Sequence, residues 1–206
     1  MQVQLDLYNS GKHPGNDADT IQTIKMVTEQ NERLSKMVKT LLDMSELQTV
    51  GRDETIIVNA LVDDVLADLE PLAQEKNIKL IGKCKDVNMV GSDILIYRLV
   101  YNLVENAIKY NHSGGQVSVE AYQREKQVYL SVKDTGNGIP EELKERVFEP
   151  FFRVDKSRSR ELGGVGLGLA LVNEIVRVHD GSIAIRPNPS GGTIIEVEFS
   201  VNRTTA

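Results

Sequence analysis

The stretch LVYNLVENAIKYN, residues 99–111, has the apolar spacing of an amphipathic helix. At about 100° per residue, polar and charged side chains share one arc: Arg98, Asn102, Glu105, Asn106 and Lys109. Leucines and valines fill the other side, which is predicted to join the core. Two asparagines one turn apart are unusual inside a helix, because Asn favours caps and turns. Amide oxygens on a rigid backbone suit Mg²⁺ and its phosphates, so this face is a candidate metal and phosphate site, with an ordinary solvated face as the alternative.

A second polar stretch, DTGNGIP at residues 134–140, follows a predicted apolar strand. The carboxylate of Asp134 can accept a hydrogen bond from an exocyclic amine such as that of adenine. Gly136 and Gly138 allow the backbone to approach a flat ring closely. Because Asp and Gly are also common turn residues, a surface turn is the alternative interpretation of this stretch.

A third stretch, RVDKSRSRELGGVGLGL at residues 153–169, places a basic segment before a run of glycines. Its cations are Arg153, Lys156, Arg158 and Arg160. The backbone N–H groups and dipole of the helix that follows would attract an anion, and the cations would neutralise it. A solvated basic loop before a closely packed helix is the alternative. Two other phosphate loops are excluded, because the glycines lack both the Gly-Lys-Ser/Thr of a Walker loop and the third glycine of a Rossmann fingerprint.

The rest of the chain alternates strands and helices after Gly51. Strands are predicted over residues 55–58, 78–82, 116–122, 127–134, 181–187 and 192–199. Helices are predicted over residues 59–76, 92–110, 140–148 and 168–179. Asn59 is the expected N-cap of the first helix, and Pro71 is expected to kink or break it. The pattern predicts an α+β fold, a two-layer α/β sandwich with helices on one face of a mixed sheet.

The first 50 residues differ from the rest. Residues 17–47 contain no Gly or Pro, and one stripe of side chains recurs at alternating spacings of three and four: Ile24, Val27, Asn31, Leu34, Val38 and Leu41. A helix this long and one-sided needs a partner helix to cover its stripe. The stripe favours a helical bundle or dimer, and a helix packed on its own domain is the alternative.

Composition narrows the class of protein. The chain has 206 residues, a formal net charge of −6 and a single cysteine, Cys84. The negative charge argues against bulk binding to nucleic acid or to an anionic membrane. No stretch approaches the roughly 20 apolar residues of a membrane span, and the N-terminus lacks the features of a signal peptide. With no disulfide possible within the chain, we expect a reducing, cytoplasmic environment.

The polar stretches occur together, in this order, in one family. From about Thr55 to Ser200 the chain resembles the ATP-binding catalytic domain of sensor histidine kinases, a class shared with gyrase, Hsp90 and MutL. NLVENAIKY resembles the family's N box, DTGNGIP its G1 box, FEPFFRVD its F box and GGVGLGL its G2 box. HDGSIAI and SGGTIIEVEF resemble the segments that close that domain. IKMVTEQNERLSKMVKTLLDMSEL resembles the second helix of the family's dimerisation and phosphoacceptor hairpin, and VQLDLY the tail of its first helix.

The resemblance implies ATP and Mg²⁺ as cofactors. It makes Asn106 the metal ligand, with Asn102 beside it in the phosphate region, while Lys109 and Tyr110 contact the nucleotide. It makes Asp134 the carboxylate that binds the adenine amino group. The further nucleotide-binding residues that it implies are Gly136, Gly138, Ile139, Phe148, Arg153, Lys156, Arg158, Gly164, Gly166, Leu167, Gly168 and Thr193.

One position separates reaction classes within this family. The hydrolysing relatives carry Glu at the position of Asn102, and an amide cannot take a proton from water. That difference favours a kinase over an ATPase. Glu105 is the nearest carboxylate but lies on a different part of the arc. Asn102, Glu105 and Lys109 are therefore the candidates for a catalytic role.

The resemblance also predicts the organisation of the protein. Residues 1–50 are expected to be part of the dimerisation hairpin, and residues 51–206 the ATP-binding domain. The parent would be a homodimeric integral membrane sensor that transfers the γ-phosphoryl group of ATP to a His, and then to an Asp of a response regulator. None of His13, His112 and His179 fits the acceptor motif, so we do not expect this chain to phosphorylate itself. The alternatives are an anti-sigma-type serine kinase and a non-catalytic, nucleotide-dependent binding module.

Overall fold

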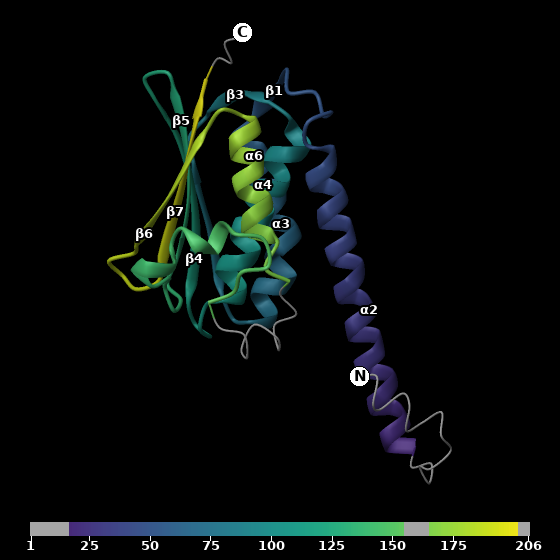
Figure 1. Cartoon of the computed structure of the whole chain (residues 1–206). Helices are drawn as coiled ribbons and strands as arrows, with labels where there is room; N and C mark the ends of the chain where they lie inside the picture. The colour runs from purple at the N-terminus through teal and green to yellow at the C-terminus, as the bar shows by residue number, and fades with distance from the viewer. Residues whose placement is uncertain (1–16, 155–164, 202–206) are drawn as a thin grey trace.

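The computed structural model describes residues 17–154 and 165–201 (Figure 1). In chain order its elements are α2 (Asp17–Glu46), β1 (Glu54–Ile57), α3 (Val58–Glu75), β2 (Lys79–Cys84), β3 (Asn88–Gly91), α4 (Asp93–Lys109), β4 (Gln116–Arg124), β5 (Gln127–Asp134), the 3₁₀ turns η1 (Glu141–Leu143) and η2 (Arg146–Phe148), α6 (Gly168–Val178), β6 (Ser182–Pro187) and β7 (Thr193–Ser200). The long helix α2 stands beside the layered body that all the other elements form (Figure 1).

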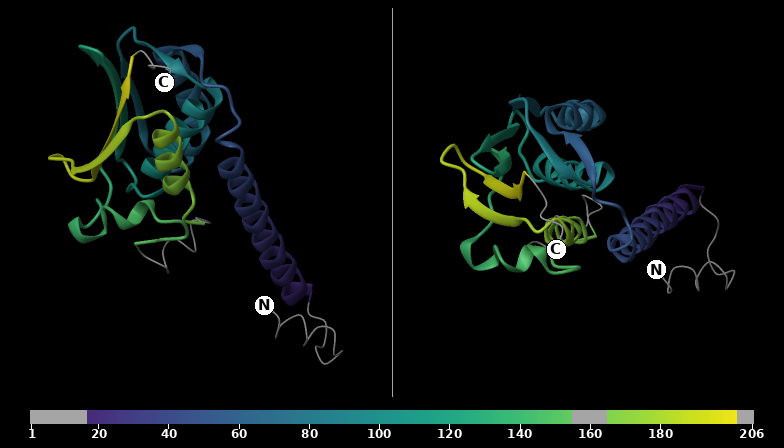
Figure 2. Two further views of the ribbon diagram at one scale, coloured as in Figure 1. Left: turned by 45° about the horizontal axis from the view of Figure 1, so that its top comes forward. Right: turned by 90° about the horizontal axis from the view of Figure 1, so that it is seen from above.

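The body is a two-layer sandwich. Its sheet has the strand order β2-β4-β5-β7-β6, with β2 parallel to β4 and every other pair antiparallel. Helices α3, α4 and α6 lie together on one face of this sheet (Figures 1 and 2). The predicted α+β sandwich with helices on one face of a mixed sheet is therefore confirmed.

The core lies between the sheet and the helices. Side chains of a strand alternate between its two faces, so every second residue points at the helices. The buried apolar residues of the three central strands are Val117, Val119, Ala121, Val128, Leu130, Val132, Ile195, Val197 and Phe199. From the helical side, Leu99, Leu103 and Ile108 of α4 are fully buried, as the amphipathic pattern predicted. This packing fixes α4 with its polar face turned away from the core.

The start of α3 differs from the prediction. The helix begins at Val58, and Asn59 lies inside its first turn instead of capping it. The backbone N–H of Val58 donates to the carbonyl oxygen of Val87 at 2.9 Å, so a distant backbone group does the work of a cap. Val87 precedes β3, a short strand that the sequence did not predict and that pairs with β1. Pro71 is exposed and does not break the helix.

The segment after Pro140 also differs. It contains two separate 3₁₀ turns, η1 and η2, where one α-helix was expected. Pro140 is the N-cap of η1 and not its first helical residue. The second turn directs Val147 inward, where it is 7% exposed.

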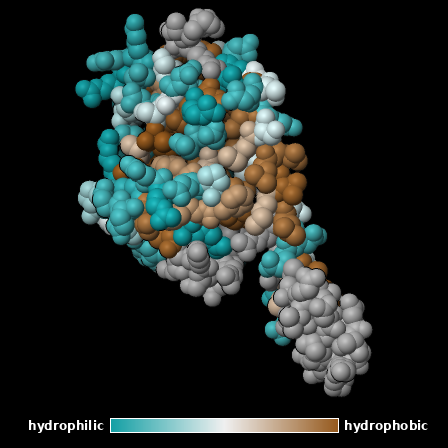
Figure 3. Space-filling view, viewed as in Figure 1, coloured by the Kyte–Doolittle hydropathy of each residue, from teal (hydrophilic) through white to brown (hydrophobic). Residues whose placement is uncertain are grey.

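The stripe on α2 is exposed over most of the helix. Its apolar members Ile24, Val27, Leu34, Val38 and Leu41 are between 41% and 60% exposed. Only the C-terminal end is covered, because Met44 packs against the core and Leu47 is buried in it. Figure 3 shows hydrophobic surface where α2 leaves the body. Packing on the described residues therefore leaves most of the stripe without a partner.

Candidate nucleotide-binding site

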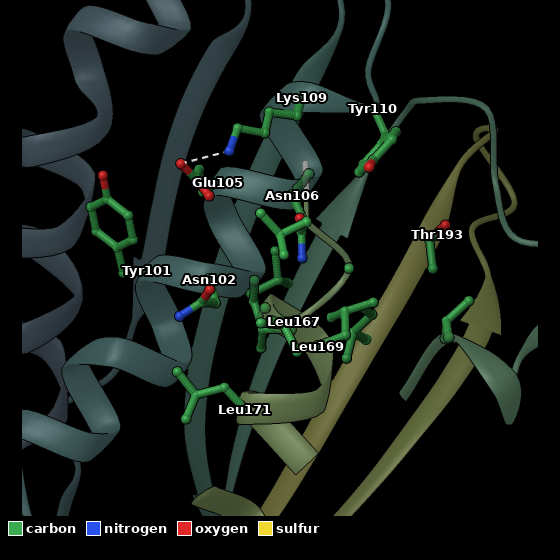
Figure 4. A pocket seen from close by; sticks show the side chains of 18 of the residues that line it. Tyr101, Asn102, Glu105, Asn106, Lys109, Tyr110, Leu167, Leu169, Leu171 and Thr193 are labelled. Carbon is green, nitrogen blue, oxygen red and sulfur yellow. Dashed lines mark ion pairs between the residues drawn. The ribbon is translucent and has the colours of Figure 1, made fainter. Parts of the chain in front are cut away.

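A cavity of about 820 Å³ opens beside the polar face of α4. That volume lies within the range of about 300–1,000 Å³ that small-molecule sites occupy. Its walls are α4, the loop after β5, the start of α6 and Thr193 at the start of β7 (Figure 4). The predicted site residues that line it are Asn102, Glu105, Asn106, Lys109, Tyr110, Asp134, Gly138, Ile139, Arg153, Gly166, Leu167, Gly168 and Thr193.

The remaining predicted residues fall elsewhere. Gly136 and Phe148 do not line the cavity, whereas Val147 and Phe152 do. Gly136 does not line the cavity itself, but its backbone N–H donates to Oδ1 of Asp134, which does. Lys156, Arg158 and Gly164 lie outside the described residues.

Asp134 is held at the end of β5 by backbone donors. Its Oδ1 accepts N–H groups from Gly136 at 2.8 Å and from Thr193 at 3.2 Å. Among residues 17–154 and 165–201, no donor contacts Oδ2. Burial raises the pKa of this carboxyl above its ordinary value, and the two N–H bonds oppose that shift. The cavity thus contains a fixed, partly desolvated carboxylate with one oxygen available to a donor on a ligand.

The loop after Asp134 is fastened to the end of α4. A Cβ on Gly136 would lie 2.6 Å from the carbonyl oxygen of Tyr110, so only glycine permits this approach. The side-chain amide of Asn137 donates to the same carbonyl at 3.2 Å. These contacts place Tyr110 and Asp134 on adjoining walls of one cavity.

The two asparagines of α4 face the start of α6. The Nδ2 group of Asn102 donates to the carbonyl of Arg98 at 2.7 Å, which leaves Oδ1 directed at α6. A Cβ on Gly168 would lie 2.9 Å from that Oδ1 and 3.6 Å from Nδ2 of Asn106. Glycine therefore lets the first turn of α6 approach both amides. The N-cap Leu167 makes no side-chain hydrogen bond, so no side-chain cap satisfies the first N–H groups of α6, and this helix start lines the cavity.

The charged side chains on the polar arc of α4 are already paired. Glu105 and Lys109 form an ion pair at 2.7 Å, drawn as a dashed line in Figure 4. Arg98 pairs with Asp43 of α2 at 2.8 Å. A ligand phosphate would have to compete with Glu105 for the ammonium group of Lys109.

The segments before and after residues 155–164 are joined by a backbone hydrogen bond. The backbone N–H of Phe151 donates to the carbonyl oxygen of Gly166 at 2.8 Å. Both residues have positive φ, +66° for Phe151 and +79° for Gly166. A Cβ on Gly166 would lie 2.7 Å from the carbonyl oxygen of Phe152, so the glycine permits this close crossing. The guanidinium of Arg146 covers the Phe152 ring at 4.4 Å from its centroid.

The structure adds residues that the sequence did not predict for the site. Lys39, Thr40 and Asp43 bring α2 to the edge of the cavity, next to the first half of α4. Asn188, in the turn between β6 and β7, donates its side-chain amide to the carbonyl oxygen of Asp134 at 2.7 Å. No local pattern marks either contact, since each joins segments far apart in the sequence.

His179 has a structural role. It is buried, and its Nε2 accepts the backbone N–H of Ser92 at 3.1 Å while Nδ1 lies 2.8 Å from the carbonyl oxygen of Ile175. His112 lies on an exposed turn, and His13 lies outside the described residues.

The donor set fits a metal that is bound mainly through a ligand. In the described parts of the chain, no group of three or more His, Cys, Asp or Glu side chains could hold a metal ion. Amide oxygens of Asn106 and Asn102 are hard donors of the kind that Mg²⁺ accepts alongside phosphate oxygens and water. Rotation of the Asn106 amide presents either its oxygen or its nitrogen to the space beside Gly168.

Comparison with known protein families identifies the class. Residues 91–203, more than half of the chain, match the family model described as histidine kinase-, DNA gyrase B-, and HSP90-like ATPase. The chain belongs to this family. The matched span contains all the described residues that line the cavity except Lys39, Thr40 and Asp43 of α2.

Individual relatives are sensor histidine kinases. The sensor histidine kinase RppB of Synechocystis is 34% identical over 180 residues, covering 85% of this chain and 40% of RppB. The sensor-like histidine kinase SenX3 of Mycolicibacterium smegmatis is 36% identical over 183 residues, covering 86% of this chain and 47% of SenX3. The chain therefore spans less than half the length of these curated relatives.

Solved structures of histidine kinases have the same fold as this chain. The catalytic domain of histidine kinase ThkA superposes with a TM-score of 0.66 at 27% identity, covering 73% of this chain and 97% of that one. ThkA in complex with the response regulator TrrA gives a TM-score of 0.76 at 25% identity, covering 97% of this chain and 57% of that one. The fold thus corresponds to the catalytic domain of a sensor histidine kinase. In residues 17–154 and 165–201, no helix combines the length and the apolar character that crossing a membrane requires.

Proposed function

We propose that this chain is the ATP-binding kinase core of a sensor histidine kinase. It would transfer the γ-phosphoryl group of ATP to a histidine on a dimerisation hairpin, for relay to an aspartate of a response regulator. The observation that carries this proposal is the fixed carboxylate of Asp134, with one oxygen available, in the same cavity as the two asparagines and the start of α6. Those walls are complementary to the two ends of a nucleotide.

The walls suggest how ATP would lie. The adenine amino group would donate to Asp134, near Ile139 and Thr193. The phosphates would then reach the N-terminus of α6, whose free N–H groups and dipole favour anions. Asn106, with Asn102 beside it, would hold the Mg²⁺ ion that neutralises phosphate charge when bound. Lys109 and Arg153 are among the cations that line the cavity and could contact the phosphates.

The pairing of the carboxylates favours a kinase over an ATPase. Hydrolysis needs a base that takes a proton from water, and the position used for that base in hydrolysing relatives is Asn102 here. Of the described carboxylates that line the cavity, Glu105 and Asp43 are ion-paired, and Asp134 lies at the adenine end. With no base poised beside the phosphates, ATP would persist until another nucleophile arrives.

We further propose that residues 1–50 belong to the dimerisation and phosphoacceptor hairpin and residues 51–206 to the ATP-binding domain. The exposed apolar stripe on α2 supports this division, because a helix from a second copy could cover it. The complex of ThkA with TrrA supports a response regulator as the partner. The relatives are sensor kinases, and we propose that the parent is a membrane-bound sensor with this part of it in the cytoplasm.

Transfer of label tests the proposed function. The chain is incubated with γ-labelled ATP and Mg²⁺, with and without a separately supplied hairpin that carries the acceptor His. We expect acid-labile label on the supplied hairpin and none on the chain itself, and Asp134→Asn should abolish the transfer. Rapid release of free phosphate without the hairpin would instead indicate an ATPase. Tight ATP binding without any transfer would favour the non-catalytic module.

A further inference from the structure

The turn between β6 and β7 lies directly against Asp134. A Cβ on Gly192 would be 2.4 Å from both the carbonyl oxygen and Oδ1 of Asp134, and 2.6 Å from the backbone nitrogen of Gly136. Gly192 has φ +86° and Gly191 has φ +93°, which L side chains rarely adopt. The two glycines therefore let the turn approach the carboxylate until the backbones are in contact.

Asn188 closes this turn with both its backbone and its side chain. Its backbone N–H donates to the carbonyl of Gly192 at 3.1 Å, and its own carbonyl accepts the N–H of Gly191 at 2.9 Å. Its Oδ1 accepts the N–H of Ser190 at 3.1 Å. The remaining group, Nδ2, donates to the carbonyl oxygen of Asp134 at 2.7 Å. With Oδ1 already bonded, the amide has one orientation, and Nδ2 must point at Asp134.

The hydrogen bonds from Asn188 and Thr193 to Asp134 take the place of the next backbone pair between β5 and β7. The pairing of β5 with β7 ends at Lys133 and Ile194. One residue further, the N–H of Thr193 donates to Oδ1 of Asp134 at 3.2 Å, and the carbonyl oxygen of Asp134 takes the Nδ2 group of Asn188. Asn188 therefore holds the backbone of Asp134 while the turn that it closes delivers the Thr193 N–H to Oδ1. Both effects leave Oδ2 as the oxygen that a ligand can reach.

We propose that Asn188 is a positioning residue that sets the selectivity of the site for a base with a 6-amino group. This proposal rests on the proposed function, because it assumes that Asp134 accepts the amino group of adenine. Asn188 does not contact the ligand in this arrangement. It fixes the direction of the carboxylate that does.

The opposing influences on the pKa of Asp134 also support this role for Asn188. Burial favours the protonated acid, and the N–H bonds from Gly136 and Thr193 favour the ionised carboxylate. Loss of the Asn188 clamp would loosen the turn that supplies the Thr193 bond. A carboxylate with one N–H fewer is less firmly aimed and less readily ionised, and both changes weaken acceptance of an amine.

Base discrimination in the whole chain tests the proposal. The affinities for ATP and for purine riboside triphosphate, which lacks the 6-amino group, are measured by calorimetry in the presence of Mg²⁺. We expect the wild type to prefer ATP, and Asn188→Ala to reduce that preference about three- to tenfold, as weakening of one hydrogen bond predicts. The affinity of Asn188→Ala for the purine nucleotide should stay within about twofold of wild type, because that nucleotide makes no bond to the carboxylate.

Two further variants sharpen the test. Asn188→Asp keeps the acceptor for Ser190 but turns an oxygen toward the carbonyl of Asp134, so it should lose at least as much discrimination as Asn188→Ala. Ser190→Ala is the matched control, because only the backbone N–H of that exposed residue contacts Asn188. Thermal melting of each variant establishes that it is folded. If Asn188→Ala does not fold, the comparison of the two nucleotides is made with Asn188→Asp.

The outcomes separate the two proposals. A wild type that binds neither nucleotide, or binds both equally, overturns the proposed function and this role together. A wild type that prefers ATP, with Asn188 variants that show the same preference, overturns the role of Asn188 alone. Equal weakening of both nucleotides also overturns it, because a merely structural residue would act on both alike.

Discussion

The guanidinium of Arg98 on α4 forms an ion pair with the carboxylate of Asp43 on α2, at 2.8 Å. Both residues line the edge of the cavity. The carbonyl of Arg98 accepts the side-chain amide of Asn102, so one residue contacts both α2 and the polar face that we assign to phosphates and metal. The position of the helix with the exposed stripe is thus linked to the nucleotide site through a few adjoining groups.

We expect this ion pair to contribute little to global stability. The side chains of Arg98 and Asp43 are 29% and 16% exposed, and partly solvated pairs contribute about 0.2–1 kcal/mol. A double-mutant cycle of Arg98→Ala and Asp43→Ala, measured by urea unfolding, should give a coupling in that range that falls at high salt. The more exposed pair Arg177–Glu174 on α6 is the control and should couple more weakly. A coupling that is insensitive to salt would contradict this assignment.

Glu105 should restrain nucleotide binding in the ligand-free chain. Its carboxylate holds Lys109 at 2.7 Å and carries negative charge into the space proposed for phosphates. Glu105→Gln should therefore raise the affinity for ATP by about two- to fivefold, the size expected from releasing a partly exposed pair. Calorimetry at two salt concentrations measures this gain, which should shrink at high salt. Glu174→Gln, which breaks the i,i+3 pair with Arg177 at a position that does not line the cavity, is the control. Weaker binding by Glu105→Gln would show that Glu105 assists the ligand.

The sequence predicted the parts of the site that depend on local pattern. The polar arc of α4 follows from helical periodicity, and the position of Asp134 follows from its place at the end of an apolar strand. Both are properties of neighbouring residues, so a single chain read in order reveals them. The sequence alone is therefore enough to name the candidate carboxylate and amides.

Contacts between distant segments were not predictable in this way. Asn188 reaches a carbonyl 54 residues earlier in the chain, and its own neighbours indicate only a turn. The expected cap at Asn59 failed for the same reason, because Val87 supplies the carbonyl that receives the first N–H of α3. Asp43 lies within the long helix predicted over residues 17–47, and nothing near it in the sequence indicates a partner on α4. Each of these contacts depends on how the fold brings distant segments together.

The buried carboxylate of Asp134 should reduce stability at neutral pH. Burial raises its folded-state pKa above the ordinary value of 3.8. Between that value and the raised pKa, the folded chain binds more protons than the unfolded one, so stability falls as pH rises through this window. Asp134→Asn removes the titrating group, so it should be more stable than wild type above the window and equal to it below pH 3.8.

Urea unfolding across a pH series measures this difference. The Asp53→Asn variant, at an exposed position, is the control for loss of a charge. The same Asp134→Asn variant should bind ATP far more weakly, because an amide nitrogen would face the adenine amine. A variant that is less stable at every pH would contradict the account of Asp134 as a desolvated carboxylate.

The paired glycines of the β6–β7 turn allow a matched comparison. Both have positive φ, so alanine at either position should cost about 1–2 kcal/mol in backbone strain. At Gly191 the nearest atom to an added Cβ is 4.0 Å away, whereas at Gly192 the Cβ would meet Asp134 at 2.4 Å. Gly192→Ala should therefore be less stable than Gly191→Ala by at least about 1 kcal/mol. It should also lose ATP affinity, because the turn must withdraw from the carboxylate. Equal stability of the two variants would show that the turn moves freely.

His179 should stabilise the contact between the end of α6 and the start of α4. Ser92 is only 1% exposed, and its backbone N–H donates to Nε2 of His179, which joins the end of α6 to the start of α4. His179→Phe keeps the ring beside Phe199 but removes the acceptor, and a buried N–H without a partner costs about 1–3 kcal/mol. Urea unfolding should show a loss of this size. His179→Gln can place a side-chain oxygen near the Ser92 N–H, so it should recover part of the loss. A phenylalanine variant as stable as wild type would mean that another group accepts the Ser92 N–H, and that the two helices which form the site do not depend on this histidine for their relative position.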